Sequence, residues 1–269
     1  MREMVKKIKL LDGTPIYCLK ASEAIILDDH IKGYLKYGIA IKDGDVIIDV
    51  GANIGVFGLR ASQWHRDVQI HSFEPVPDIY DVLKKNASLS KNDRFHSYNM
   101  GLGSKADTIN FTYFPNSPAL STAHSEMWEE DPEIFNKAVR GSIKNAPNSM
   151  WYTKLIPDFM IPMIGKILMN GKKEVTAKVG TLSGFVTEKN LQRINLLKLD
   201  CEGHEWEVLQ GISEEHWPII ESLVIEIHDI DERASKTESL LREKGFTRIN
   251  LEKEKALEET SLINLYATR

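Results

Sequence analysis

The sequence has 269 residues, of which 42% are hydrophobic and 27% are charged, which indicates one large globular domain or one core with an insertion. Its 34 basic and 39 acidic residues give a net charge of −5 and form no basic block, which argues against a nucleic-acid partner. No run of 18 apolar residues occurs, and the basic first residues lack the apolar run of a signal peptide, so we expect no membrane partner.

Short apolar runs, most of them followed by helix-like periodicity, are the clearest signals along the chain. The helix after the second run should begin at Pro77, and the helices after two later runs should end at Gly211 and Gly245. We expect strands over 46–48, 68–73, 94–98, 196–199, 223–227, 249–251 and 263–267. The last two should form a hairpin-like pair. Continuous apolar strands that alternate with helices predict an α/β fold with a parallel sheet covered on both faces.

The pattern divides the chain into three regions. Residues 1–44 are expected to pack on a core that spans 45–269, and this core is interrupted between 114 and 172. The interruption holds six prolines and many aromatic, Met and Ile residues, and it is too long for a bare loop. It is either a packing subdomain or a lid over the substrate. We favour the lid, because insertions at strand ends of such folds shape the ligand pocket.

The strongest local motif is the heptad from Asp49 to Gly55, Asp-Val-Gly-Ala-Asn-Ile-Gly, which leaves a buried strand and enters a helix near Ile54. Glycine lets the backbone pass close under a ligand, and N–H groups at a helix start favour a carboxylate or phosphate. Asp49 could receive a ligand ammonium, so the heptad suits a zwitterionic amino-acid end. Glu74, 23 residues after Gly51, could accept both hydroxyls of a ribose. A dinucleotide site needs a glycine two residues after Gly51, which is missing here, and the other alternative is an ordinary tight turn.

With several later stretches, this heptad resembles the FkbM-type methyltransferase family over nearly the whole chain. The matching stretches are 34–39, 45–59, Phe73-Glu74-Pro75, 195–200, 223–230 and 262–267. Within the family, the chain most resembles the O-methyltransferases of polyketide and nonribosomal peptide assembly lines. It departs from them at Asp200-Cys201-Glu202-Gly203-His204-Glu205, a form closer to free-standing members that are thought to act on sugars.

The resemblance implies a class I methyltransferase sheet, Rossmann-like, mostly parallel and seven-stranded, with S-adenosylmethionine as cofactor and S-adenosylhomocysteine as product. Asn99 and Met100 follow the strand over 94–98, where adenine contacts usually fall. The expected cofactor-binding residues are Tyr34, Asp49, Gly51, Asn53, Gly55, Glu74, Pro75, Asn99, Met100 and Asp200.

Candidate catalytic residues lie where two neighbouring strands of such a sheet end. Methyl transfer to an alcohol is an in-line displacement, so the protein must position the hydroxyl and remove its proton. We expect His228 to be the base, since a histidine that titrates near neutrality suits that role, although it could instead hold a neighbouring loop. Glu226 shares its face of the strand, and Asp200 should flank the methyl group or act only as a cap. His204 is a second candidate base, or it simply starts a helix.

Three of the acids could also form a metal site. Asp200, Glu226 and Asp229 together offer the hard oxygen ligands that Mg²⁺ prefers, as in some catechol-type methyltransferases. We expect no metal, because clustered acids more often form a solvated rim.

The leading functional hypothesis is an O-methyltransferase that acts on a polyketide or peptide intermediate, either as a small molecule or tethered to a carrier protein. A sugar or glycan O-methyltransferase is the alternative in the same class. A non-catalytic cofactor-binding module is a further alternative, which the intact cofactor motif and candidate base oppose. The chain has only two cysteines, Cys18 and Cys201, and a reducing, cytoplasmic setting fits them.

Overall fold

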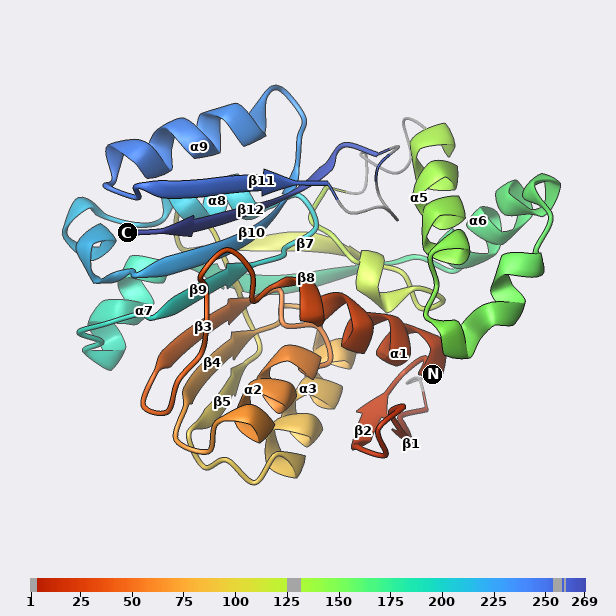
Figure 1. Cartoon of the computed structure of the whole chain (residues 1–269), viewed down its shortest axis with the longest axis horizontal. Coiled ribbons are helices and arrows are strands. Elements are labelled where there is room, and N and C mark those ends of the chain that lie inside the picture. The colour runs from red at the N-terminus through yellow and green to blue at the C-terminus, as the bar shows by residue number, and fades with distance from the viewer. Residues whose placement is uncertain (1–3, 125–131, 254–257, 259) are drawn as a thin grey trace.

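A seven-stranded sheet forms the centre of the computed structural model, which describes residues 4–124, 132–253, 258 and 260–269 (Figure 1). Its strands are β3 (Val46–Val50), β4 (Gln69–Phe73), β5 (Phe95–Tyr98), β9 (Leu196–Leu199), β10 (Ser222–His228), β11 (Arg248–Glu252) and β12 (Leu262–Thr268). They lie in the order β11-β12-β10-β9-β3-β4-β5. Only β12 runs antiparallel to its neighbours, β10 and β11, and the other pairs are parallel. The predicted sheet and its closing hairpin are confirmed.

Both faces of this sheet are buried, because successive side chains of a strand point to opposite faces. On β3, Ile47 belongs to an apolar core with α1 (Ala21–His30), α2 (Val56–Trp64) and α3 (Pro77–Leu89). The next residue, Ile48, belongs to a second core with α7 (Leu182–Lys189), α8 (Glu205–Gln210) and α9 (Arg233–Glu243). Neither residue is exposed to solvent. The continuous apolar runs of the sequence therefore reflect strands that are buried on both sides.

Two helix boundaries show how local residues set the geometry. Helix α3 begins at Pro77, as predicted, because proline fits the first helical position. Helix α2 begins at Val56, two residues later than expected. Asn53 and Gly55 both have a left-handed backbone, with φ of 50° and 79°, and this conformation cannot continue a right-handed helix.

The described N-terminal residues pack on the first core. They form β1 (Lys6–Lys9), β2 (Pro15–Cys18), α1 and a short 3-10 helix, η1 (Ile31–Gly33). The Asn86 side chain of α3 accepts a hydrogen bond from the Tyr17 N–H and donates one to the Tyr17 carbonyl, at 2.8 and 2.9 Å. This pair ties β2 to the helix layer.

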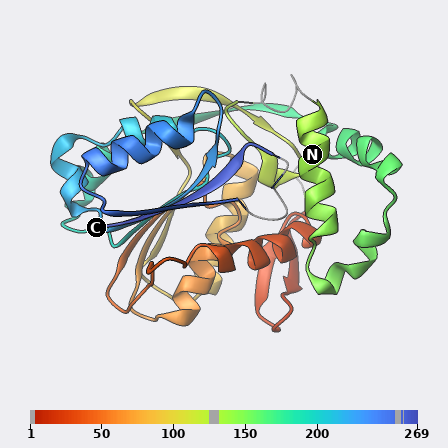
Figure 2. The same cartoon turned by 45° about the horizontal axis from the view of Figure 1, so that its top comes forward.

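A second, three-stranded sheet is formed by β6 (Gly101–Leu102), β7 (Asp107–Tyr113) and β8 (Lys173–Gly180). Between β7 and β8 lie the 3-10 helices η2 (Pro118–Leu120), η3 (Asn148–Leu155) and η4 (Asp158–Met160), with α5 (Pro132–Lys144) and α6 (Ile161–Met169). Helices α5 and α6 stand at one end of the molecule, beyond the ends of the central strands (Figures 1 and 2). They have a small apolar cluster of their own, built on Phe114, Phe135, Val139 and Ile161. Over the described residues, no helix is both long and apolar enough to cross a membrane.

Candidate functional site

A cavity of about 80 Å³ lies at the carboxyl ends of β3, β4 and β9. Its walls come from α1, the heptad turn, the residues after β4, the second sheet, η2 and the segment after β9. The lining residues are Leu27, Val50, Gly51, Asn53, Glu74, Pro75, Ile79, Gly101, Leu102, Phe111, Pro118, Ala119, Ser121, Asp200, Cys201, Glu202 and His204. The carboxyl edge of an open α/β sheet is the usual place for a ligand, so the cavity is the candidate site.

The heptad turn is shaped by close packing inside the protein. Gly51 has a φ of 72°, and a Cβ atom on it would lie 1.7 Å from the carbonyl oxygen of Asp200. The N–H groups of residues 51–55 are all used in internal hydrogen bonds, that of Asn53 to the Glu74 carboxylate. The sequence had predicted instead that Gly51 passes under a ligand and that unpaired N–H groups at the helix start face this ligand. Gly51 is required because β3 and the residue after β9 approach each other closely.

Asp49 does not line the cavity and is completely buried. It accepts a hydrogen bond from the Ser72 hydroxyl at 3.0 Å, and its other oxygen lies 3.1 Å from the Lys198 ammonium. Lys198, 3% exposed, also donates to the Gly51 carbonyl at 2.9 Å. Burial opposes the charge of Lys198, but the carboxylates of Asp49 and Asp200 outweigh it and raise the pKa of the ammonium. The predicted contact of Asp49 with a ligand ammonium is therefore replaced by an internal ion pair.

Sequence reasoning missed Lys198, although a lysine inside the apolar strand 196–199 is itself a signal, since a buried lysine requires a partner.

Glu74 does line the cavity, at the end of β4. Its carboxylate accepts hydrogen bonds from the N–H groups of Asn53 and Val76, at 3.1 and 2.9 Å. Burial raises the pKa of Glu74 to about 7, although these two hydrogen bonds act in the opposite direction. With one bond to each oxygen, the carboxylate has lone pairs left for two ligand hydroxyls. Gly55, in contrast, lies behind the turn and packs against Leu83, so it shapes the turn only.

The residues predicted to contact adenine lie outside the cavity lining. Asn99 is exposed and donates hydrogen bonds to the carbonyl oxygens of Glu74 and Pro75, both at 3.0 Å. Met100 packs in the second core. The next two residues, Gly101 and Leu102, line the cavity instead. The adenine contact of Asn99 and Met100 stays a prediction, and the cavity wall is formed two residues later, where the chain enters β6.

Asp200 lies at the cavity beside Lys198 and Tyr34. The Tyr34 hydroxyl donates to the Asp200 carboxylate at 2.8 Å, and the Lys198 ammonium lies 3.4 Å away. Burial alone would raise the pKa of Asp200, but the charges of Lys198 and His30 and the Tyr34 hydrogen bond lower it. Tyr34 is 3% exposed and does not line the cavity, so it positions Asp200.

His228 has an environment different from that of the expected base. It is 2% exposed, does not line the cavity, and lies 3.5 Å from Glu202 and 3.8 Å from Glu205. Burial disfavours its charge, but these two carboxylates raise the pKa of His228 to about 10. The imidazole is therefore protonated at neutral pH and cannot accept a proton there.

Glu202 is the member of this group that lines the cavity. Its backbone has a φ of 52°, a left-handed conformation that is uncommon for a non-glycine residue and is found at functional sites. Its carbonyl accepts a hydrogen bond from the Thr122 hydroxyl at 2.5 Å. Burial raises the pKa of the Glu202 carboxyl to about 7, against the lowering effect of His228. Sequence reasoning noted the surrounding motif but not this residue.

The predicted Mg²⁺ ligands do not come together as a set. Asp229 accepts a hydrogen bond from the Ala234 N–H at the start of α9, whereas Asp200 and Glu226 group with Glu202, with carboxylate oxygens within 4.8 Å of one another. Each of these three acids already has a basic partner: Lys198 for Asp200, His228 for Glu202, and the His30 imidazole at 3.2 Å for Glu226. Because basic side chains already occupy the positions next to these carboxylates, the site fits Mg²⁺ poorly.

His204 lines the cavity just before α8. Its Nδ1 atom lies 3.1 Å from Nε2 of His124 and 3.8 Å from a carboxylate oxygen of Glu207. Burial lowers the pKa of His204 despite the nearby Glu207 carboxylate. The backbone of His204 therefore does start a helix, as the alternative interpretation held, and its side chain faces the site.

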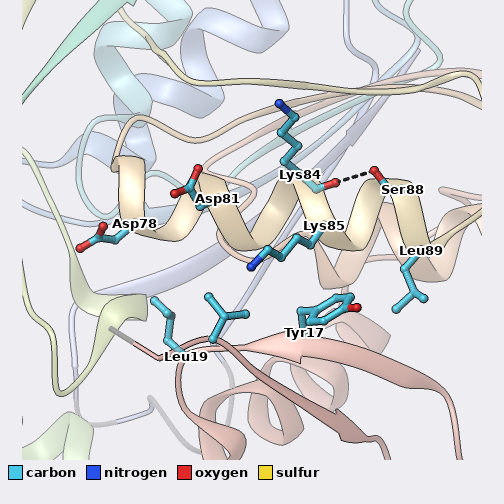
Figure 3. Close-up of a pocket in the computed structure, with 9 residues that line it drawn as sticks. Tyr17, Leu19, Asp78, Asp81, Lys84, Lys85, Ser88 and Leu89 are labelled. Atoms are coloured by element: carbon cyan, nitrogen blue, oxygen red, sulfur yellow. Dashed lines mark hydrogen bonds between the residues drawn. The ribbon is translucent and has the colours of Figure 1, made fainter. Parts of the chain in front are cut away.

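A larger groove of about 890 Å³ lies between β2 and α3 (Figure 3). The Lys85 and Leu89 side chains of the helix lie on the side that faces Tyr17 of the strand, whereas the Lys84 side chain points away from the strand. None of the predicted site residues lines it. Its opposite charges and its distance from the strand ends make it a poorer candidate than the smaller cavity.

The sheet order and the single antiparallel strand are those of the class I methyltransferase fold. Residues 49–248 match the family described as Methyltransferase FkbM domain, and the chain belongs to this family. The family and the fold imply the use of S-adenosylmethionine.

Two relatives and one solved structure illustrate the similarity. The 31-O-demethyl-FK506 methyltransferase FkbM of Streptomyces tacrolimicus is 30% identical over 250 residues, which cover 92% of this chain and 91% of that protein. Methyltransferase sdnD of Sordaria araneosa is 32% identical over 243 residues, which cover 87% and 86%. The crystal structure of Methyltransferase FkbM from Methylobacillus flagellatus KT aligns with a TM-score of 0.47 at 13% identity, over 85% of this chain and 45% of that one.

Proposed function

We propose that the protein is an S-adenosylmethionine-dependent O-methyltransferase whose acceptor is a hydroxyl of a polyketide or peptide natural-product intermediate, free or tethered to a carrier protein. The observation that carries this proposal is that one cavity holds Glu74 at one wall and the carboxylates of Asp200 and Glu202 at another. The relative from Streptomyces tacrolimicus, whose name specifies a 31-O-demethyl substrate, supports oxygen as the acceptor atom.

The lining residues fit the parts of S-adenosylmethionine. Glu74 is suited to the ribose hydroxyls, and Ile79, Leu102 and Phe111 offer an apolar wall for adenine. Asp200, which Lys198 and Tyr34 keep ionised, is suited to the ammonium group in place of Asp49. Gly51, Asn53 and Pro75 complete the wall between these groups.

When bound, S-adenosylmethionine supplies an electrophilic methyl group on a sulfonium. The protein must then hold the acceptor hydroxyl and take its proton. We assign the proton acceptance to Glu202, because its carboxylate lines the cavity while the expected base, His228, lies behind it. His228 acts as a positioning residue, since its positive charge holds the carboxylates of Glu202 and Glu205 in place. Glu226, whose carboxylate lies 3.2 Å from the His30 imidazole, adds negative charge that helps to raise the pKa of Glu202.

The segment that covers the cavity is the proposed lid. Pro118, Ala119 and Ser121 line it, whereas no residue of α5 or α6 does. Ligand pockets usually measure 300–1,000 Å³. Since this cavity measures about 80 Å³, cofactor and acceptor require the η2 segment to move outward. Within the expected insertion over 114–172, the lid function therefore belongs to its first residues, and α5 and α6 support them from outside.

A methyl-transfer assay tests the proposal. Carrier-bound hydroxyacyl substrates, the same compounds released from the carrier, and free sugars are each incubated with the protein and labelled S-adenosylmethionine. Label in an ether of the natural-product substrates is the expected result. Label only in the sugars favours the glycan alternative, and binding of S-adenosylmethionine without transfer to any hydroxyl favours the non-catalytic module.

A further inference from the structure

We propose that His124, His204 and Glu207 form a binding site for one divalent transition-metal ion, with Zn²⁺ as the best-fitting cation. One nitrogen from each imidazole and one carboxylate oxygen lie within 4.8 Å of one another. The chain brings them together from two distant segments, because His124 follows η2 and the other two flank the start of α8. His204 and Glu207 are three residues apart, a spacing that places both on one side of a helical turn.

The distances fit a tetrahedral ion. With bonds of about 2.0–2.1 Å, ligand atoms of a tetrahedral zinc site lie roughly 3.3 Å apart. The two imidazole nitrogens are 3.1 Å apart, and His204 Nδ1 is 3.8 Å from Glu207 Oε2. The third pair of ligand atoms also lies within 4.8 Å, so rotations of these side chains would bring all three atoms onto one ion.

The carboxylate oxygen that faces the imidazoles is the independent observation. Glu207 Oε2 is buried and accepts no hydrogen bond from the described residues. The other oxygen, Oε1, lies 3.9 Å from the Arg233 guanidinium, which also donates to the Gly203 carbonyl at 2.7 Å. Arg233 thus orients the carboxylate through Oε1 and leaves Oε2 directed at the histidines. A buried acceptor without a donor is costly, and a cation in this position would satisfy it.

The donor set selects the class of metal. Two imidazoles and one carboxylate suit zinc and its borderline neighbours, whereas Mg²⁺ and Ca²⁺ prefer oxygen ligands. The alternative explanation is a pair of imidazoles that share one proton, and this leaves Oε2 of Glu207 unsatisfied. Since His204 also lines the cavity, a fourth position on the ion would be open on that side. The ion would link the residues after η2 to α8, next to the proposed lid.

The test uses the full chain without S-adenosylmethionine, so its result is independent of methyl transfer. After removal of metal with a chelator, Zn²⁺ binding is measured by calorimetry, and Co²⁺ is added as a spectroscopic probe. We expect one equivalent of Zn²⁺ and the intense visible absorption of tetrahedral Co²⁺. Glu207→Gln and His124→Ala should each weaken Zn²⁺ binding at least tenfold.

His216→Ala is the matched control, because the His216 imidazole contacts the hydroxyls of Ser183 and Ser213 and does not belong to the cluster. It should bind Zn²⁺ like the unchanged protein. The near-isosteric Glu207→Gln keeps the test valid if His124→Ala unfolds. Absence of Zn²⁺ binding at micromolar concentration, or equal binding by all the variants, would overturn the proposal.

Discussion

The two walls of the cavity are built in different ways. The wall with the proposed ribose contact, called the cofactor wall, is formed by residues between 50 and 79, and the Asn53 N–H joins the heptad turn to Glu74 by a hydrogen bond. The opposite wall, called the acceptor wall, includes Asp200 and Glu202, and residues far away in the chain hold them from behind. The Tyr34 hydroxyl donates to the Asp200 carboxylate, and the Thr122 hydroxyl donates to the Glu202 carbonyl. The charges of the acceptor wall depend on burial and on pairing between these segments. A local motif therefore identifies the first wall, while the second becomes visible only in the folded chain.

The largest effect is expected at Glu202. If its carboxylate takes the hydroxyl proton, Glu202→Gln should lower kcat by about 10²–10⁴ and leave the affinity for S-adenosylmethionine nearly unchanged. Single-turnover kinetics and calorimetry measure the two quantities. Near-normal turnover of this variant, combined with loss of turnover in His204→Ala, would move proton acceptance to the histidine.

Lys198 tests how the two walls are joined, since it lies between Asp49 and Asp200. Lys198→Met should lower the free energy of unfolding by about 3–5 kcal/mol, because two buried carboxylates then lose their shared cation. Denaturant unfolding measures this, with the exposed Lys91→Met as control. A loss below about 1 kcal/mol would show that the ion pairs are not required.

Glu74 tests the cofactor wall alone. Glu74→Ala should weaken the binding of S-adenosylmethionine by about 1–3 kcal/mol, because the charge-assisted hydrogen bonds to ribose are lost. The affinity for a methyl acceptor should change much less. If calorimetry finds an unchanged affinity for S-adenosylmethionine, the ribose does not lie at this carboxylate.

The smallest predicted effect is a pH dependence that arises from the same residue. The pKa of Glu74 is raised to about 7, so the carboxyl is ionised above this pH and protonated below it. Affinity for S-adenosylmethionine should therefore fall as the pH decreases through 7, by no more than about tenfold, because protonation removes one hydrogen-bond acceptor. In Glu74→Gln this step should be absent. A step that persists in the variant belongs to another group.

The sequence predicted the central sheet well because buried parallel strands are mostly apolar, as in β3 and β9, which each contain one charged residue, Asp49 and Lys198. The second sheet was not predicted, because β7 shows no alternation of exposed and buried residues: its first four residues are exposed or half-buried and its last three are buried. At the site, the sequence motif and its spacing to Glu74 were enough to propose the heptad turn and Glu74 as candidates. The protonation of His228 could not be predicted from the sequence, because it follows from contacts with Glu202 and Glu205 that the fold creates.

The expectation that the chain binds no nucleic acid stays a prediction.

Calorimetry of the unchanged protein with S-adenosylmethionine, S-adenosylhomocysteine and NADH tests the central claim most directly. The arrangement of Glu74, the apolar wall and Asp200 in one cavity predicts that the first two ligands bind and that NADH does not. Tight binding of NADH with no heat from S-adenosylmethionine would contradict the account.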